Sequence, residues 1–306
     1  MISADGKGVP MRRGPDDPKP KAHRDKGDKA NKKRMAIVGA IYSVDRYIRT
    51  PLEVVAALFG DPRTDQPKAR PIPVGKHVWA RMSRAVDGSL GEPIDTVFSW
   101  LSQELGRRNA FGRPVVCLMD GQEALWDGRE RHVAGTVVEV LDILHVTPRL
   151  WQAAQLFHPE KSQEAAGFVR DRLERILRGG VKSVVTGLRR LGTLRGLSGA
   201  KKKTLRTLTN YLSNNAGRMR YDEYLRNGYP IASGVIEGAC RHYVKDRMER
   251  SGMRWTKAGA QAMLDVRSEF INGEWDQFQK HRIETETRRM YPHRLVLKDI
   301  GWPLVA

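Results

Sequence analysis

The chain has 306 residues, and its 54 lysines and arginines outnumber 35 acids, giving a formal net charge of +19 that favours a polyanionic partner. Two cysteines, Cys117 and Cys240, exclude a disulfide scaffold and a four-cysteine zinc site. With no apolar run near the roughly 20 residues of a membrane span, and no signal peptide, we expect a soluble cytoplasmic protein without a membrane partner.

The first third of the chain predicts strands separated by polar connections. Asp5 follows a short β-compatible run and precedes two glycines, so it reads either as a strand-end carboxylate or as part of a turn. Residues 14–34, rich in Pro, Lys, Asp and Gly, predict a flexible loop whose cations either meet phosphates or are simply solvated. Residues 35–42 and 45–48 predict paired strands, and residues 52–59 predict a short helix.

The middle of the chain predicts a buried strand that ends at a carboxylate. Residues 93–108 have apolar side chains at helical spacing, and Val115 to Met119 form a continuous apolar run typical of a strand buried on both faces. Asp120 ends that run, and open α/β sheets bind ligands at the carboxyl ends of such strands. An Asp-Gly pair is also a common turn. Residues 136–144 predict the next strand.

Asp142 and His145 stand at the end of that next strand. One interpretation is a metal site, and the other is a histidine held by a nearby carboxylate that supports the site from behind.

Residues 148–229 predict a basic helical region. Helices are expected over 163–178, 181–191 and 199–212, the last with Ser198 as a candidate N-cap. Between Arg170 and Arg220 there are 14 lysines and arginines against two acids, and Lys201, Lys202 and Lys203 are the densest cluster. The region is either a surface that faces nucleic acid or a well-solvated helical surface, and we favour the first.

Residues 234–255 predict a helix with two different faces. Glu237, Arg241 and Lys245 are four residues apart and stack on one face. An apolar stripe seats the opposite face on a core: Ile236, Ala239, Cys240, Tyr243 and Val244. The charged row is either a functional site or a solvated face with ordinary salt bridges.

Several of these segments together resemble one family. GYPIASGVIEGACRHYVKDRMERSGMRWT (228–256) resembles the end of the catalytic domain of bacterial insertion-sequence transposases of the ISKra-type group. DGKGVPMR (5–12) and CLMDGQEALW (117–126) resemble the segments of that family that carry its first and second aspartates. LDILHV (141–146) resembles its Asp-x-x-His element. The resemblance covers residues 5 to 292 and is most specific at the glutamate helix.

The resemblance implies a DDE transposase with a ribonuclease-H-like α/β core, a mixed sheet flanked by helices. Residues 1–147 would form the first part of the core, 148–229 a basic all-helical insertion, and 230–306 the glutamate helix and a helical tail. Asp5, Asp120 and Glu237 would be the catalytic residues and would hold two Mg²⁺ or Mn²⁺ ions for DNA cleavage and strand transfer.

The resemblance also implies partners and supporting residues. The substrate would be double-stranded DNA, as transposon ends and target, bound by a nucleoid-associated homo-oligomer. Asp142 and His145 would support the site. DNA-contacting candidates are Arg241, Lys245, Arg254, Trp255, Lys201, Lys202 and Lys203. Trp255 would stack on a frayed base or pack in the core.

The start of the chain departs from the family pattern, because only four residues precede Asp5. We therefore expect a catalytic part without its N-terminal region, with a shortened first strand that positions Asp5 poorly. One alternative is an inactive transposase-derived DNA-binding fragment. Another is a general basic RNA-binding protein, which would need more stacking surface than 7% aromatic residues supply.

Overall fold

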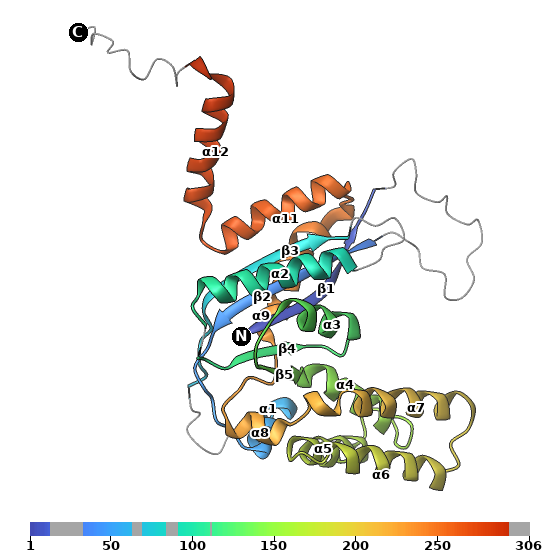
Figure 1. Cartoon of the computed structure of the whole chain (residues 1–306). Coiled ribbons are helices and arrows are strands. Elements are labelled where there is room, and N and C mark those ends of the chain that lie inside the picture. The colour runs from blue at the N-terminus through green and yellow to red at the C-terminus, as the bar shows by residue number, and fades with distance from the viewer. Residues whose placement is uncertain (13–32, 63–68, 84–90, 111, 294–306) are drawn as a thin grey trace, which may run out of the picture.

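A mixed sheet of five strands organises the chain. The computed structural model describes residues 1–12, 33–62, 69–83, 91–110 and 112–293 (Figure 1). The strand order is β3-β2-β1-β4-β5. The strands are β1 (Ile2–Pro10), β2 (Lys33–Ser43), β3 (Val74–Met82), β4 (Val115–Met119) and β5 (Val137–Leu141). This α/β arrangement of an open mixed sheet flanked by helices is compatible with a ribonuclease-H-like fold.

Strand β1 lies at the centre and joins the two halves of the sheet. It pairs antiparallel with β2 over nine positions, from Ile2 opposite Ile41 to Pro10 opposite Lys33. On its other side it pairs parallel with β4. The expectation of a shortened first strand is therefore wrong, since three paired residues of β1 precede Asp5 and five follow it. The alternative interpretation of Asp5 as part of a turn is also wrong, because β1 continues through Asp5 without a break.

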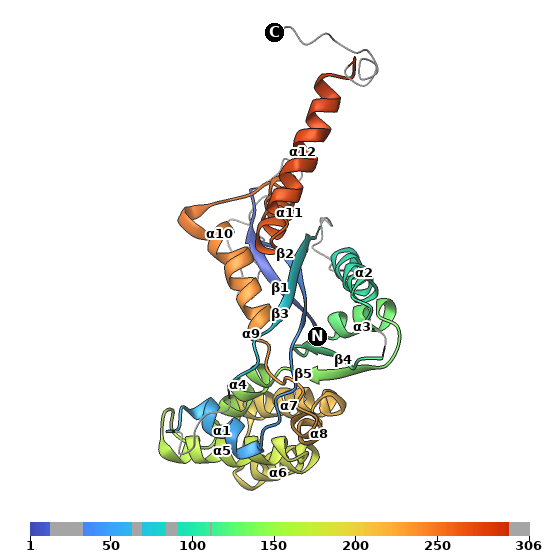
Figure 2. The ribbon, with the colours of Figure 1, turned by 90° about the vertical axis from the view of Figure 1, so that its left-hand side faces the viewer.

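Helices cover both faces of the sheet (Figure 2). Helices α2 (Gly91–Arg107) and α3 (Glu123–His132) lie on one face, where Ile94, Val97, Phe98 and Leu101 of α2 pack in one buried cluster with Ile2 and Cys117. The opposite face is covered by a helical segment that starts with α9 (Gly234–Gly238) and by α11 (Lys257–Ile271). Side chains of a helix return to the same face every 3.6 residues and those of a strand every two residues. Apolar residues at these spacings give α2 and the strands their apolar faces.

The remaining helices form a bundle beside β4 and β5. They are α1 (Pro51–Phe59), α4 (Ile143–Ala154), α5 (Gln163–Leu177), α6 (Val181–Leu194), α7 (Gly199–Asn214), a short turn (Ala216–Arg218) and α8 (Tyr221–Arg226). Local signals fix several starts: Thr50 forms a capping box with Glu53, and Ser162 caps α5. Val116 and Leu118 of β4 share one buried cluster with these helices, so the bundle and the sheet have a common core.

Side chains from neighbouring helices form hydrogen bonds with backbone groups of both edge strands, β5 and β3. On β5, Tyr221 Oη donates to the Leu141 carbonyl at 2.7 Å, and Tyr224 Oη donates to the Glu139 carbonyl at 2.7 Å. On β3, Gln261 of α11 donates to the Ala80 carbonyl at 3.0 Å and accepts from the Met82 N–H at 2.8 Å. Covered edges do not pair with other chains.

The segment from Gly234 is not the single α-helix that its sequence predicts. After α9 the chain forms a π-helix (Ala239–Lys245), one turn of α10 (Asp246–Met248) and a 3-10 turn (Arg250–Gly252). The helical path ends before Trp255, whose backbone instead bridges to Met11 beside β1. All five residues of the expected apolar stripe are buried, which confirms which face is seated.

Three other expectations need correction. Residues 45–48 form no strand; Tyr47 instead donates its backbone N–H to Gly228 at 2.9 Å. Residues 136–144 contain only the five-residue β5, because Asp142 caps α4 directly afterwards. Ser198 precedes α7 without a side-chain capping bond. Of the loop expected over 14–34, residues 14–32 lie outside the described ranges, and residues 33 and 34 belong to β2.

The last helix, α12 (Trp275–Met290), projects away from the rest of the molecule and has no buried residue (Figure 1). Across the described ranges, no helix combines the length and apolar character that crossing a membrane requires.

Candidate active site

Two aspartates lie side by side on neighbouring parallel strands. Ile2 of β1 is paired with Cys117 of β4; three residues further along are Asp5, within β1, and Asp120, directly after the last residue of β4. Parallel strands run roughly 5 Å apart, so the two backbones are close at this level. Because side chains alternate between faces, both aspartates point away from the α2 and α3 cluster that contains Ile2 and Cys117.

Asp5 is tied to the helical segment that carries Glu237. One carboxylate oxygen accepts from the Gly6 N–H at 2.6 Å, and the other accepts from the Cys240 thiol at 3.3 Å. Burial, followed by the neighbouring Asp5 carboxylate, raises the pKa of Cys240, so this thiol stays protonated and can donate. This contact joins residues 5 and 240 and places the glutamate segment over β1.

Asp120, directly after β4, lies where ionisation of its carboxyl group is disfavoured. Its Oδ1 accepts from the Gln122 N–H at 2.9 Å, and its carbonyl accepts from Trp126 Nε1 at 2.8 Å. Burial raises the pKa of Asp120, and the nearby Asp5 carboxylate raises it further. A carboxyl group whose ionisation is opposed by a neighbouring carboxylate favours a cation beside it.

Glu237 completes the set of acids from the other side. It is exposed at the end of α9, and its backbone N–H donates to the Ser233 carbonyl at 3.3 Å. Partial burial raises the pKa of Glu237, and the carboxylates of Asp142 and Asp5 add to the rise. Glu237 therefore lies within the electrostatic field of Asp5 on β1 and of Asp142 directly after β5.

Asp142 fixes the start of α9 to the end of β5. Its side chain is buried, accepts from Leu144 N–H at 2.8 Å, and accepts from both the N–H (3.2 Å) and the hydroxyl (2.9 Å) of Ser233. Its own N–H donates to Met119 at 2.8 Å. Asp142 thus holds together β4, α4 and the turn that precedes Glu237.

His145 lies next to this buried carboxylate without a hydrogen bond to it. Its Nδ1 is 3.9 Å from Asp142 Oδ2, beyond hydrogen-bond distance, and has no hydrogen-bond partner among the described residues. Its imidazole lies near enough to Asp120 and Glu237 to lower the pKa of each carboxyl group, against the rise that burial causes. The carboxylate of Asp142 therefore does not hold the histidine by a hydrogen bond, as that interpretation expected, and binds Ser233 and Leu144 instead.

The expected DNA-contacting residues lie in separate places. Arg241 and Lys245 are exposed on the π-helix, and Arg254 is exposed after it. The half-buried Trp255 packs on the core, and its Nε1 donates to Met248 at 3.1 Å, which is the packing role rather than a free stacking surface. The exposed Lys201, Lys202 and Lys203 start α7, about 14 Å along the helix from its end near Asp120.

Two further residues, Tyr211 and Arg149, lie near the site, and no sequence pattern indicates them. Tyr211, near the end of α7, lies so close to Gly121 that a Cβ added there would be 2.4 Å from its ring. Burial raises the pKa of Tyr211, and the adjacent Asp120 carboxylate adds to the rise. The Arg149 guanidinium lies over the Tyr211 ring, 4.7 Å from its centroid. Only the packing of α7 against α4 brings these residues to the strand end.

The chemistry of the acids suits a hard divalent cation, but the acids are not gathered into a finished site. Carboxylate oxygens are the ligands that Mg²⁺ and Mn²⁺ prefer. Within the described ranges, no three His, Cys, Asp or Glu side chains are grouped closely enough to hold a metal ion. Asp5, Asp120 and the mobile side chain of the exposed Glu237 are the residues that would hold one.

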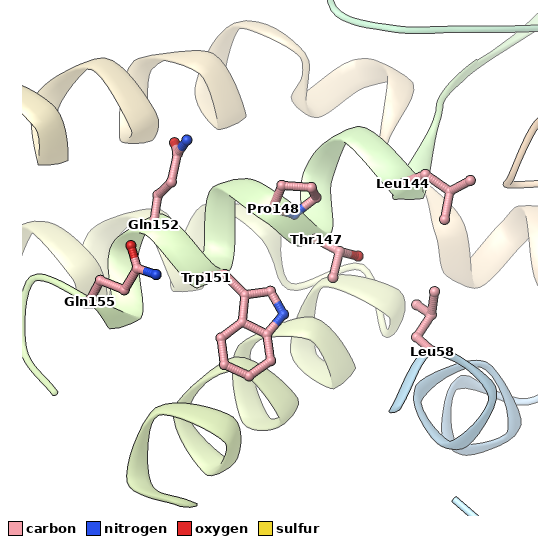
Figure 3. A pocket seen from close by; sticks show the side chains of 7 residues that line it. All are labelled: Leu58, Leu144, Thr147, Pro148, Trp151, Gln152 and Gln155. Carbon is pink, nitrogen blue, oxygen red and sulfur yellow. The ribbon is translucent and has the colours of Figure 1, made fainter. Parts of the chain in front are cut away.

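A groove of about 440 Å³ lies elsewhere, between α1 and α4 (Figure 3). Its lining is mostly apolar and comprises Leu58, Leu144, Thr147, Pro148, Trp151, Gln152 and Gln155. None of the proposed catalytic acids lines it, so it is separate from the carboxylate site.

The fold and site define an α/β protein in which Asp5 lies within β1 and Asp120 directly follows the neighbouring parallel strand β4. Comparisons of the chain with protein-family models, with curated proteins and with solved structures gave no match. The functional assignment therefore rests on the residues and their arrangement.

Proposed function

We propose that the chain is the catalytic part of a DDE transposase that cleaves DNA and transfers its strands by a metal-dependent mechanism. The observation that carries the proposal is the contact between Cys240 and Asp5, which brings the segment of Glu237 to the sheet face that carries Asp5 and Asp120. The strand order supports a ribonuclease-H-like core, and the helices between α4 and α9 support the reading of a basic helical insertion.

The proposed role of the acids follows from their electrostatics. Bound divalent cations supply an activated nucleophile and stabilise the leaving oxygen in phosphodiester chemistry. Asp5 is aligned by Gly6 and Cys240, and Asp120 by Gln122, so two of the three carboxylates are held in place by hydrogen bonds. Glu237 is exposed and remains free to turn toward them.

The proposed DNA surface combines the two sides of this site. Arg241 and Lys245 extend from the π-helix beyond Glu237, and Lys201, Lys202 and Lys203 lie on α7. Cations in these positions would neutralise phosphates on either side of the cleaved bond, and binding would weaken steeply with salt. A π-helical turn next to Glu237 fits the frequent occurrence of such turns at functional sites.

Nicking of supercoiled plasmid DNA tests the proposal. We expect nicking that requires Mg²⁺ or Mn²⁺ and is lost in Glu237→Gln, because the amide keeps the size of the side chain but loses its charge. Glu223→Gln, at an exposed glutamate of α8, is the matched control and should nick like the wild type. Equal nicking by Glu237→Gln would overturn the proposed chemistry.

One observation favours a second candidate, a transposase-derived fragment that binds DNA without cutting it. The three acids do not form a ready group of metal ligands in the described part of the chain. This candidate predicts salt-dependent DNA binding with no nicking under any of the metal conditions, and the same plasmid assay separates the two.

A further inference from the structure

Arg149 is set apart from the other cations of the helical bundle by its place and by its partners. It lies on α4, one turn after His145 and two turns after the capping residue Asp142. It is half-buried, and among the described residues it forms no ion pair and no hydrogen bond. The arginines of α5 differ, since Arg170, Arg172 and Arg175 each bind a carboxylate.

The stacking contact holds the Arg149 side chain in one place. Its guanidinium lies over the face of Tyr211, 4.7 Å from the ring centroid, which is within the range of a cation–π interaction. Stacking uses the face of the guanidinium and leaves its N–H groups, which lie in its plane, available to an anion. The side chain is therefore ordered before any ligand arrives.

Tyr211 fixes this cation relative to the carboxylates. Its ring and hydroxyl fit against Gly121, where a Cβ would lie 2.7 Å from the Tyr211 oxygen. Gly121 directly follows Asp120, so the order in space is Asp120, Tyr211 and Arg149. If the cleaved phosphate of a DNA strand lies at Asp120, a neighbouring phosphate of that strand would lie near the guanidinium of Arg149. The paired N–H groups of the guanidinium are suited to bind it.

We propose that Arg149, held by Tyr211, binds a DNA phosphate next to the one that is cleaved at Asp5, Asp120 and Glu237. The proposal rests on the proposed function and adds a positioning contact to it, from a helix that carries none of the three acids. Arg149 takes no part in the bond-breaking step.

The test measures the affinity of the chain for a duplex oligonucleotide at a series of salt concentrations without metal. For Arg149→Gln we expect a slope of log affinity against log salt that is shallower by about 0.9, the loss of one phosphate contact. Affinity at about 0.1 M salt should fall by nearly an order of magnitude. Arg149→Lys keeps the charge and should keep most of the slope.

Arg175→Gln is the matched control, because Arg175 is exposed on α5 and already paired with Asp171. Its slope should stay close to that of the wild type. A salt slope in Arg149→Gln equal to that of the wild type would overturn the proposal, and so would an equal loss in Arg175→Gln.

The outcome separates this inference from the proposed function. If the wild type and the Arg149→Gln variant both bind duplex DNA with the same steep dependence on salt, only the proposed role of Arg149 is rejected. A wild-type chain that shows neither salt-dependent binding nor nicking would remove the proposed function and this inference with it. Unchanged thermal unfolding of each variant confirms that a lost contact, and not a lost fold, is measured.

Discussion

Replacing Asp142 by Asn should weaken the fold and loosen the placement of Glu237. The buried carboxylate accepts Leu144 N–H with one oxygen and both donors of Ser233 with the other. An amide has only one oxygen, so either orientation of Asn leaves a backbone N–H facing an NH₂ group.

The size of the effect follows from these bonds. A hydrogen bond to a charged group contributes about 1.5–3 kcal/mol, and a buried donor left without an acceptor costs about 1–3 kcal/mol. Because the Ser233 hydroxyl can turn and accept from the amide, we expect a total loss of about 2–5 kcal/mol for Asp142→Asn. Ser233→Ala removes only the hydroxyl bond and should cost about 1.5–3 kcal/mol.

Urea unfolding followed by circular dichroism measures both losses. The double variant should show a coupling of roughly 0.5–3 kcal/mol between the two sites, as contacting residues do. Asp171→Asn, at an exposed ion pair of α5, is the control and should cost less than about 1 kcal/mol. An Asp142→Asn protein within about 0.5 kcal/mol of the wild type would refute the account of this clamp.

Four further substitutions test the packing, an edge-strand hydrogen bond and the charge of Asp120. Gly128→Ala would place a Cβ 2.3 Å from a methyl group of α2, so thermal unfolding should show a loss of about 1–3 kcal/mol. Gly187→Ala, with open space around it, should instead gain up to about 1 kcal/mol, and a reversed order would contradict the packing. Tyr221→Phe leaves the Leu141 carbonyl of edge strand β5 unpaired and should cost about 1–3 kcal/mol in urea; no change would argue against the bond. Since burial raises the pKa of Asp120 above its ordinary 3.8, the folded state holds that proton more tightly, and metal-free stability should fall as pH rises through the raised value. Asp120→Asn should flatten this fall in a pH series of unfolding midpoints, and an unaltered profile would exclude Asp120 as its source.

The sequence predicted those parts of the fold that are encoded locally. The continuous apolar run before Asp120 forms β4, and the residues with helical spacing over 93–108 form most of α2. A strand buried on both faces leaves a continuous apolar run, whereas a helix buried on one face leaves apolar residues at helical spacing. The stripe from Ile236 to Val244 is buried as expected, although the turn around it is π-helical. A stripe defines a face but does not determine how tightly the turns are wound.

The features that the sequence did not predict depend on contacts between distant segments. Strand β3 is an edge strand whose backbone is bonded by the side-chain amide of Gln261 in α11, more than 170 residues later in the chain, so no local pattern indicates it. Tyr211 and Arg149 read as ordinary helix residues, since only the packing of α7 on α4 brings them to Asp120. Residues 45–48 have strand-like composition but lie against Gly228 instead of a strand.

The central claim is that Asp5, Asp120 and Glu237 together hold divalent cations. Titration of the metal-free chain with Mn²⁺, followed by electron paramagnetic resonance of the free ion, tests it most directly. The account predicts up to two bound ions per chain, with affinity sharply reduced in Asp120→Asn and Glu237→Gln and unchanged in Glu223→Gln. Wild-type binding that both site variants retain in full, or no binding by the wild type at all, would contradict the account.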